Sequence, residues 1–391
     1  MHSARRRHAS TATSHADLID GAWDDVLDLL PPGLDGMAKE EIQFRRRGGI
    51  QAASDVLRIG MAYSVLDFSL RSAAVWMVTH DLGDISDVAV LGRLRRSWKF
   101  FARILTEMLV TRTRFSPTPQ FPYRVRLIDG TCLSAPGATG ADWRIHATYD
   151  VSRGVVDHIE LTDHKGGEHL DRAAARPGDL IVGDRGYAHA ARIIEVRQAR
   201  AHVLVRIGHN AVPLVDAKGR EVDPLAFARR KRERAGRPPR VEETAVFLRD
   251  DKTLSYPLRL VVVRKTGDST RLARKKLTSE AAKKQKKPMQ RTLDAAAFIF
   301  LLTSVPVVDA DATAMAELYR VRWQVELNFK RWKSVFDLDR LRASDPDLAK
   351  AYIYAKLIAA CLSDTLARAA RAVSPWGVPL RPLALAPGGL G

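Results

Sequence analysis

Residues 319 to 333 read YRVRWQVELNFKRWK, from Tyr319 to Lys333, and the rest of the chain can be placed around this stretch. Wound as an α-helix at about 100° per residue, it gathers a phenol, three cations and one carboxylate within an arc of about 60°. These are Tyr319, Arg322, Lys330, Lys333 and Glu326. An adjacent arc about 80° wide is apolar, the stripe that an amphipathic helix buries. It holds Leu318, Val321, Val325, Phe329, Trp332 and Phe336. We therefore predict one helix from Asp311 to Asp339.

The charged arc has two interpretations. Cations and a phenol around one carboxylate suit an anion such as phosphate, with a metal ion to neutralise it. An ordinary solvated helix surface also carries mixed charges. The stretch alone does not decide between them.

The composition indicates a globular protein with a polyanionic partner. The chain has 391 residues, of which 46% are hydrophobic, so it can bury a sizeable core and is long enough for about two or three domains. Its formal net charge is +18. Such a surplus favours nucleic acid and predicts salt-sensitive association.

Cysteine usage and hydropathy bear on the compartment. Cys132 and Cys361 lie far apart without metal-ligand spacing, which fits a reducing compartment and excludes a disulfide framework or a zinc module. No apolar run approaches the roughly 20 residues of a membrane span, and the N-terminus lacks the apolar segment of a secretory signal. The expected location is the cytoplasm, associated with DNA in the nucleoid.

The first third of the chain has a helical pattern. Residues 1–15 form a basic tail that we expect to be disordered, and residues 16–115 carry helical periodicity. Within them, segments 69–78 and 86–96 predict two short helices around the linker 82–85, which resembles a helix-turn-helix. Arg93, Arg95 and Arg96 would then meet DNA phosphates. A small helical bundle with surface arginines explains the pattern equally well.

After a proline-rich linker at 115–122 the period changes to two. Residues 123–129 predict a strand with Asp129 on its apolar side, ended by Gly130-Thr131. A hairpin (144–150 and 155–162), a short helix (168–175), a buried strand (180–183) followed by Asp184, a helix (188–200) and a strand (201–207) come next. This order predicts a mixed α/β sheet with helices on its faces, and active sites of such sheets gather at the carboxyl ends of parallel strands. Asp129 and Asp184 are both placed there.

The pattern breaks between residues 208 and 293. Alternating segments at 242–248 and 256–263 predict strands, and two basic runs (229–234 and 283–287) are either solvated segments or phosphate contacts. This block is interpreted as a β-rich insertion. The core resumes with a strand at 297–303 and covers 120–207 and 294–340. Residues 341–391 are predicted to form a closing helix and a tail.

Three acidic residues now stand out: Asp129, Asp184 and Glu326. They resemble the catalytic set of the DDE transposases. The signature Tyr-x2-Arg-x3-Glu-x6-Lys of the insertion-sequence IS-four family is met by Tyr319, Arg322, Glu326 and Lys333. Asp129-Gly130-Thr131 and Asp184-Arg185-Gly186-Tyr187 are similar to that family's motifs around the two aspartates.

The resemblance implies a ribonuclease H-like core and cut-and-paste movement of an element with terminal inverted repeats. Water attacks the phosphodiester at the element end, and in several members the freed 3′ hydroxyl forms a hairpin before joining to target DNA. By the same analogy, the protein is expected to bind double-stranded DNA, at the terminal repeats and at the target, and to act as a homodimer in a synaptic complex.

Displacement at phosphorus explains the acidic set physically. Two divalent ions about 3.5 to 4 Å apart supply a deprotonated nucleophile and relieve charge on the phosphoryl oxygens, and carboxylates are the ligands that Mg²⁺ and Mn²⁺ prefer. We expect two Mg²⁺ ions, replaceable by Mn²⁺, with Asp129 bridging both and Asp184 and Glu326 each holding one. Arg322, Lys330, Lys333 and Tyr319 would bind neighbouring phosphates.

Other candidates are weaker. Phe298, Phe300 and Trp323 could stack on an unpaired base, although core packing better suits the two phenylalanines. Four histidines (146, 158, 164 and 169) straddle a hairpin without ligand-like spacing, and Asp142, Asp150 and Asp163 compete with Asp129 for the first position. Two rival functions stay open: a domesticated, non-catalytic DNA-binding protein, and a metal-dependent nuclease without strand transfer.

Overall fold

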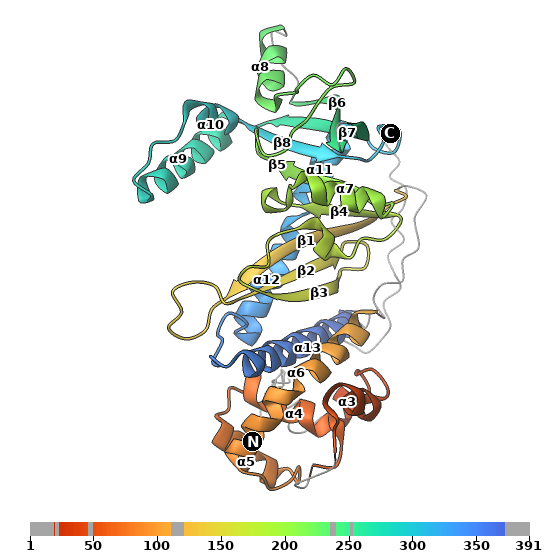
Figure 1. Cartoon of the computed structure of the whole chain (residues 1–391), viewed down its shortest axis with the longest axis vertical. Helices are drawn as coiled ribbons and strands as arrows, with labels where there is room; N and C mark the ends of the chain where they lie inside the picture. Colours follow the sequence, from red (N-terminus) through yellow and green to blue (C-terminus); the bar gives the residue numbers. More distant parts are fainter. Residues whose placement is uncertain are drawn as a thin grey trace, which may run out of the picture. The chain divides into compact units, whose positions relative to one another are not determined.

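A computed structural model describes residues 19, 23–45, 50–110, 121–234, 240–250 and 253–371. The chain divides into two compact units (Figure 1). We call residues up to 111, 134–140 and from 332 onward the helical unit, and residues 112–133 and 141–331 the sheet unit. The predicted basic tail (1–15) and most of the predicted linker (115–122) lie outside the described residues. Among the described helices, none is long and apolar enough to cross a membrane.

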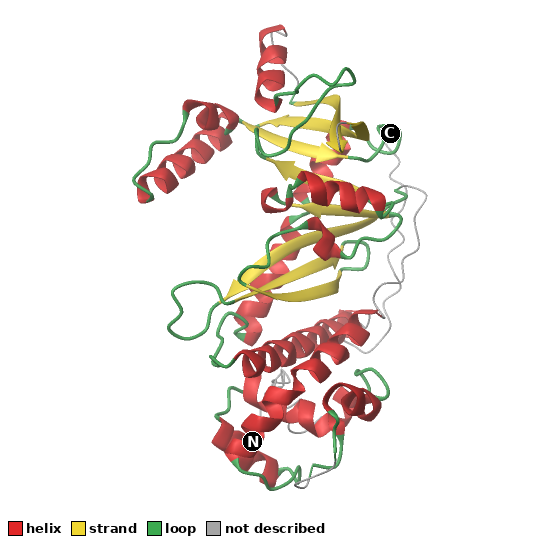
Figure 2. Cartoon of the chain, in the orientation of Figure 1, coloured by secondary structure: helices red, strands yellow, loops and turns green. Residues whose placement is uncertain are grey.

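The helical unit combines both ends of the described chain (Figure 1), and helices dominate it (Figure 2). Its helices are α2 (Trp23–Leu27), α3 (Leu34–Ile42), α4 (Ala53–Ser64), α5 (Leu70–Thr79), α6 (Asp87–Val110) and α13 (Pro346–Arg371). α13 packs against α4 and α6, so the closing helix shares the core of the N-terminal helices. α4 and α6 also approach closely, because a Cβ on Gly60 would fall 2.7 Å from the ring of Phe101.

The helix predicted at 86–96 is longer than expected, since α6 continues to Val110. Its extension buries Phe100, Phe101 and Ile104 in the helical core. The preceding helix is capped at its N-terminus: the Ser69 hydroxyl accepts a hydrogen bond from the backbone N–H of Ser72 at 3.0 Å.

The described strands of the sheet unit form one eight-stranded sheet in the order β3-β2-β1-β4-β5-β8-β7-β6. They are β1 (Arg124–Leu133), β2 (Trp143–Asp150), β3 (Val155–Asp163), β4 (Asp179–Gly183), β5 (His202–Ile207), β6 (Val241–Asp250), β7 (Thr253–Arg264) and β8 (Phe298–Thr303). β1, β4 and β5 are parallel, and the other pairs are antiparallel. This is the predicted mixed α/β sheet, and the order of its first five strands is that of a ribonuclease H-like core.

Helices cover and extend this sheet. They are η1 (Leu170–Ala173), η2 (Arg185–Tyr187), α7 (Ala190–Gln198), α8 (Pro224–Arg234), α9 (Gly267–Lys283), α10 (Gln290–Ala295), α11 (Ala312–Arg320) and α12 (Trp323–Phe336). α7 buries Ile193 and Val196 in a core with Ile181, Val203 and Leu302. α9, which the structure describes throughout, buries none of its residues and projects with α10 from the sheet (Figure 1).

Three expectations are corrected by these elements. β1 does not end at Gly130-Thr131 but continues to Leu133, because that segment pairs with β2. The single helix predicted from Asp311 to Asp339 is two helices separated by a turn at 321–322. The stretch 208–293 contributes β6 and β7, which extend the core sheet beyond β8, and also the helices α8 and α9.

Candidate active site

The parallel pairing of β1 with β4 brings Asp129 and Asp184 side by side. The paired residues run from Arg124 opposite Asp179 to Leu127 opposite Val182, and the same offset sets Asp129 opposite Asp184. β4 ends at Gly183, so Asp184 follows its carboxyl end as predicted. Asp129 lies within its strand instead, because it remains paired with β2.

A buried tyrosine, Tyr187, packs beside the two aspartates. Tyr187 is fully buried in η2, and a Cβ on Gly130 would lie 3.2 Å from its hydroxyl oxygen and 3.4 Å from Nδ1 of His146. A Cβ on Gly183 would lie 3.1 Å from the Cβ of Tyr187. The glycines next to both aspartates therefore let the side chain of Tyr187 pack closely against β1 and the end of β4. The sequence motif contained this tyrosine, but nothing in its pattern revealed the contact.

Arg322 joins the three acidic residues. It lies in the turn between α11 and α12, where its side chain is only 15% exposed. Its Nη1 lies 3.9 Å from Oδ2 of Asp129, and its Nη2 lies 3.9 Å from Oδ2 of Asp184 and 2.5 Å from Oε1 of Glu326. The predicted carboxylates thus converge on one side chain of the signature helix, which is broken where it meets them.

Tyr319 also belongs to this cluster. Its hydroxyl donates a hydrogen bond to Oδ1 of Asp184 at 3.0 Å, and burial raises its pKa well above the ordinary value. Arg206 of β5, which sequence reasoning missed, places Nη1 4.0 Å from the same oxygen. It was missed because β5 carries no motif, and only the pairing of β4 with β5 brings it near Asp184.

The two aspartates have opposite pKa shifts. Burial raises the pKa of Asp129 to about 6 against the lowering effects of the Gly130 N–H and of Arg322, while Glu326 raises it further. Burial also acts to raise the pKa of Asp184, but the Arg185 N–H, Arg322 and other donors outweigh it, and the net shift is downward. Neighbouring carboxylates with divergent pKa values are typical of functional sites.

Lys333, the last residue of the signature, and Lys330 lie apart from these contacts. Lys330 is exposed on α12, and Lys333, which is half-buried, belongs to the part of α12 that falls within the helical unit. Trp323 is 53% exposed at the start of α12, whereas Phe298 and Phe300, which belong to β8, are buried in the core.

The three carboxylates are suitable ligands for divalent metal ions, although they do not stand close enough together to enclose one. Within the described part of the chain, no three His, Cys, Asp or Glu side chains stand close enough together to hold a metal ion as they are. Carboxylate oxygens are nevertheless the ligands that Mg²⁺ and Mn²⁺ prefer, and Asp129, Asp184 and Glu326 already contact one shared cation.

Two of the three competing acidic residues, Asp150 and Asp163, have partners elsewhere. Asp150 accepts a hydrogen bond from Nε of buried Arg124 at 2.9 Å, and Asp163 accepts one from the backbone N–H of Lys165 in a turn at 2.9 Å. His146 lies between the Tyr187 hydroxyl (3.4 Å) and Oγ1 of Thr162 (3.3 Å). Burial lowers its pKa to about 3, as expected for a neutral side chain in the core.

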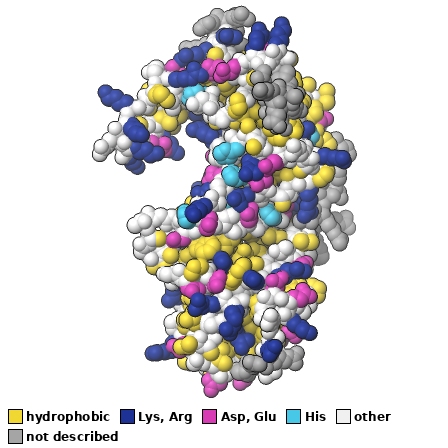
Figure 3. Space-filling model, viewed as in Figure 1, with side chains coloured by type: hydrophobic (Ala, Val, Ile, Leu, Met, Phe, Trp, Pro, Cys, Tyr) yellow, Lys and Arg dark blue, Asp and Glu magenta, His cyan; other side chains and the backbone are white. Residues whose placement is uncertain are grey.

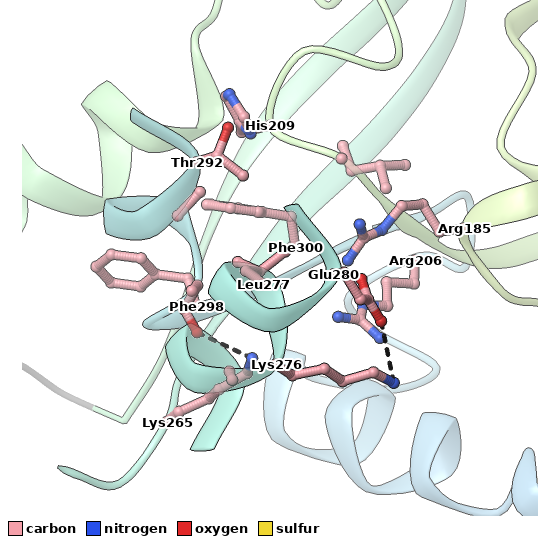
Figure 4. Close-up of a pocket in the computed structure, with 15 residues that line it drawn as sticks. Arg185, Arg206, His209, Lys265, Lys276, Leu277, Glu280, Thr292, Phe298 and Phe300 are labelled. Carbon is pink, nitrogen blue, oxygen red and sulfur yellow. Dashed lines mark hydrogen bonds and ion pairs between the residues drawn. The ribbon is translucent and has the colours of Figure 1, made fainter. Parts of the chain in front are cut away.

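A basic cavity of about 270 Å³ adjoins this corner (Figure 4). It is lined by Arg185, Arg206, His209, Lys265 and Lys276, with Phe298 and Phe300 among its apolar walls. Arg185 directly follows Asp184 in the chain. Phosphates beside the aspartates would therefore meet positive charge.

The three predicted DNA-binding arginines of the helical unit have different surroundings. Nη2 of Arg95 is paired with Oδ2 of Asp345 at 2.9 Å. Arg93 and Arg96 instead line a cavity of about 160 Å³ together with Arg45. The pKa of Arg93 is lowered, chiefly by burial and also by the positive charge of Arg96. Lys and Arg side chains spread widely over the face seen in Figure 3.

Comparisons with known proteins show which family this chain resembles. The family described as "Transposase DDE domain" matches residues 120–362. The chain is 34% identical to the transposase InsL for insertion sequence element IS186A of Escherichia coli strain K12, over 88% of this chain and 93% of that protein. Its identity to the transposase for element IS421 of Escherichia coli is also 34%, with the same coverage. Among solved structures, a piggyBac transposase synaptic complex with hairpin DNA aligns with a TM-score of 0.43 and 11% identity, over 90% of this chain and 75% of that one.

Proposed function

This chain belongs to the DDE transposase family and acts on DNA as a transposase, and we propose that it moves an insertion sequence by cut-and-paste transposition. It would bind the terminal inverted repeats, cleave the strand at each end, and join the freed 3′ hydroxyl to target DNA. The observation that carries the proposal is the contact of Arg322 with Asp129, Asp184 and Glu326, three acidic residues from separate parts of the sequence.

A DDE domain implies the use of divalent metal ions, and we propose two Mg²⁺ ions, replaceable by Mn²⁺. Asp129 would bridge them, and Asp184 and Glu326 would each hold one. Such ions supply a deprotonated water and offset charge on the phosphoryl oxygens. The low pKa of Asp184 keeps this ligand ionised at neutral pH.

The cations around the acids would hold the DNA. Arg322, Lys330 and Lys333 would bind phosphates beside the scissile bond, and Tyr319, already donating to Asp184, would orient that carboxylate or a phosphate. The basic cavity would bind the neighbouring DNA backbone. The helical unit would grip the element end with Arg93 and Arg96.

Joining two ends requires two active sites, so we propose a homodimer in the synaptic complex. The substrate places the enzyme at the DNA of the nucleoid. Both proposals rest on the family and on the reaction.

End-labelled terminal-repeat duplex incubated with protein and Mg²⁺ tests the function. We expect nicking at the element end, followed by joined products when target DNA is added, and no nicking by Asp129→Ala. Nicking without joined products would support the nuclease without strand transfer. Binding without nicking by the wild type would support the non-catalytic DNA-binding protein, and equal nicking by Asp129→Ala would refute the assigned site.

A further inference from the structure

One guanidinium occupies the place between the acids where a cation is needed. Arg322 touches Glu326 at 2.5 Å and approaches one oxygen each of Asp129 and Asp184 at 3.9 Å. Its positive charge also acts on the pKa of both aspartates. Arg322 thus provides, from within the chain, part of the charge compensation that a divalent ion would provide.

Arginine and metal ions compete for the same oxygens. The metal ions held by Glu326 and by Asp184 would need carboxylate oxygens that now lie beside Nη2 of Arg322, and a guanidinium beside a divalent ion would add like-charge repulsion. Metal loading therefore requires Arg322 to turn away. Turning away costs the charge-assisted hydrogen bond to Glu326 and the two longer ion pairs, in a largely buried position.

A DNA phosphate offers the displaced side chain another partner. A guanidinium binds phosphate through two parallel N–H donors, and these hydrogen bonds would replace the one that Arg322 makes to Glu326. The turn at 321–322 helps, because Arg322 is not held inside a regular helix there. Its backbone carbonyl still accepts the N–H of Val325 at 3.3 Å, so the side chain can change partner without unwinding α12.

We propose that Arg322 is a built-in counter-cation that opposes metal loading of the three carboxylates until a DNA phosphate draws it away. This proposal rests on the proposed function, since it takes Asp129, Asp184 and Glu326 to be the metal ligands. It makes DNA and metal ions bind with positive coupling, and by linkage each raises the affinity for the other by the same factor. Ion-dependent cleavage would then be confined to protein that already holds DNA.

The test measures Mn²⁺ binding by the full-length protein. Titration calorimetry and the electron paramagnetic resonance signal of free Mn²⁺ are the two readouts. The DNA probe is a short duplex that ends at the already cleaved repeat, so no cutting intervenes. We expect this duplex to raise the wild-type affinity for Mn²⁺ by about tenfold. Arg322→Gln should bind Mn²⁺ about tenfold more tightly than the wild type without DNA, and its affinity should rise little when the duplex is added.

The matched control is Arg206→Gln. Arg206 approaches only Asp184, at 4.0 Å, so its removal should change Mn²⁺ affinity clearly less than the removal of Arg322. An Arg322→Gln protein that binds Mn²⁺ equally or more weakly would overturn the proposal and leave Arg322 as a residue that only holds the acids in place. Should that variant not fold, as judged by circular dichroism, the wild type decides alone: equal Mn²⁺ affinity with and without the duplex overturns the proposal.

A second variant separates this proposal from the function beneath it. Asp129→Asn should weaken Mn²⁺ binding whether or not Arg322 competes. Unchanged Mn²⁺ binding in Asp129→Asn would refute the metal site and with it the proposed function. Weakened binding there, with no increase of affinity in Arg322→Gln, would refute only the coupling.

Discussion

The hydroxyl of Tyr187 lies where a side chain on Gly130 would have to begin. A Cβ on Gly130 would stand 3.2 Å from that oxygen, closer than ordinary van der Waals contact, and the ring is fully buried. Because Gly130 follows Asp129, any shift of β1 that relieves such a contact also moves a candidate metal ligand.

Gly130→Ala should therefore lower both stability and cleavage. Overpacking of this kind costs about 1–3 kcal/mol, measurable as a fall in the urea midpoint and as slower nicking of terminal-repeat DNA. Tyr187→Phe removes the obstructing oxygen, so the double variant should be more stable than the sum of the single effects predicts. Simple additivity of the two changes would contradict the contact.

The buried His146 predicts a pH dependence of stability. Its folded pKa is about 3 against an ordinary 6.5, chiefly because burial disfavours the charged ring. As pH falls below 6.5 the unfolded histidine takes up a proton while the folded one stays neutral. The unfolded state then binds more protons, and stability falls with falling pH between these two values.

Urea unfolding at pH 7.5 and pH 5 measures this effect. The loss of stability for the wild type should exceed that for His146→Gln by about 2 kcal/mol, since about one and a half pKa units of the window are crossed. His164→Gln, a change at an exposed histidine, should behave like the wild type. An equal loss in His146→Gln and the wild type would show that another group carries the dependence.

Asp157 holds two buried arginines at the start of β1. Its carboxylate pairs with Arg124, and with Arg126 at 2.9 Å from Nε, and all three side chains are almost inaccessible. Asp157→Ala leaves two buried cations short of a partner and should cost about 3–5 kcal/mol in a urea titration.

An exposed ion pair supplies the contrast. Asp268 and Arg271 lie 2.7 Å apart with more than three quarters of each side chain accessible. Asp268→Ala should cost less than about 1 kcal/mol. Similar costs for the two alanine variants would mean that the cluster at Asp157 is solvated in solution.

The helical unit offers matched arginines on one helix. Arg93→Gln and Arg96→Gln should each weaken binding of terminal-repeat duplex and reduce the slope of log affinity against log salt by about one. Arg95→Gln should change the slope less, because Arg95 is already paired with Asp345. Fluorescence anisotropy across a salt series measures all three, and the largest change of slope in Arg95→Gln would contradict the assignment.

Sequence patterns predicted the strand that contains Asp129 and the strand that Asp184 follows, because the patterns of both strands lie within a few neighbouring residues. Alternation of apolar and polar residues indicated β1, and a short apolar run indicated β4. Because parallel strands of one sheet point the same way, the two aspartates were expected near each other. The segment after Asp129 was misjudged because β2 holds it in the sheet: Gly130-Thr131 looked like a stop, but cross-strand pairing continues to Leu133.

The signature helix shows the other limit. Periodicity correctly marked Val325, Phe329, Trp332 and Phe336 as its buried stripe, but the same periodicity hid the break at 321–322. That break coincides with contacts from Arg322 to residues distant in sequence, which no window of neighbouring residues contains. Arg206 and the core position of α13 escaped prediction for the same reason.

Single-turnover cleavage of terminal-repeat duplex by two glutamine variants tests the central claim most directly. Glu326→Gln removes a carboxylate that touches Arg322, whereas Glu317→Gln removes an exposed one on the preceding helix. With both variants folded and bound to the duplex, we predict that cleavage by Glu326→Gln falls at least about 100-fold and that cleavage by Glu317→Gln stays close to the wild-type rate. Wild-type cleavage by Glu326→Gln would contradict the account that three carboxylates form one catalytic centre.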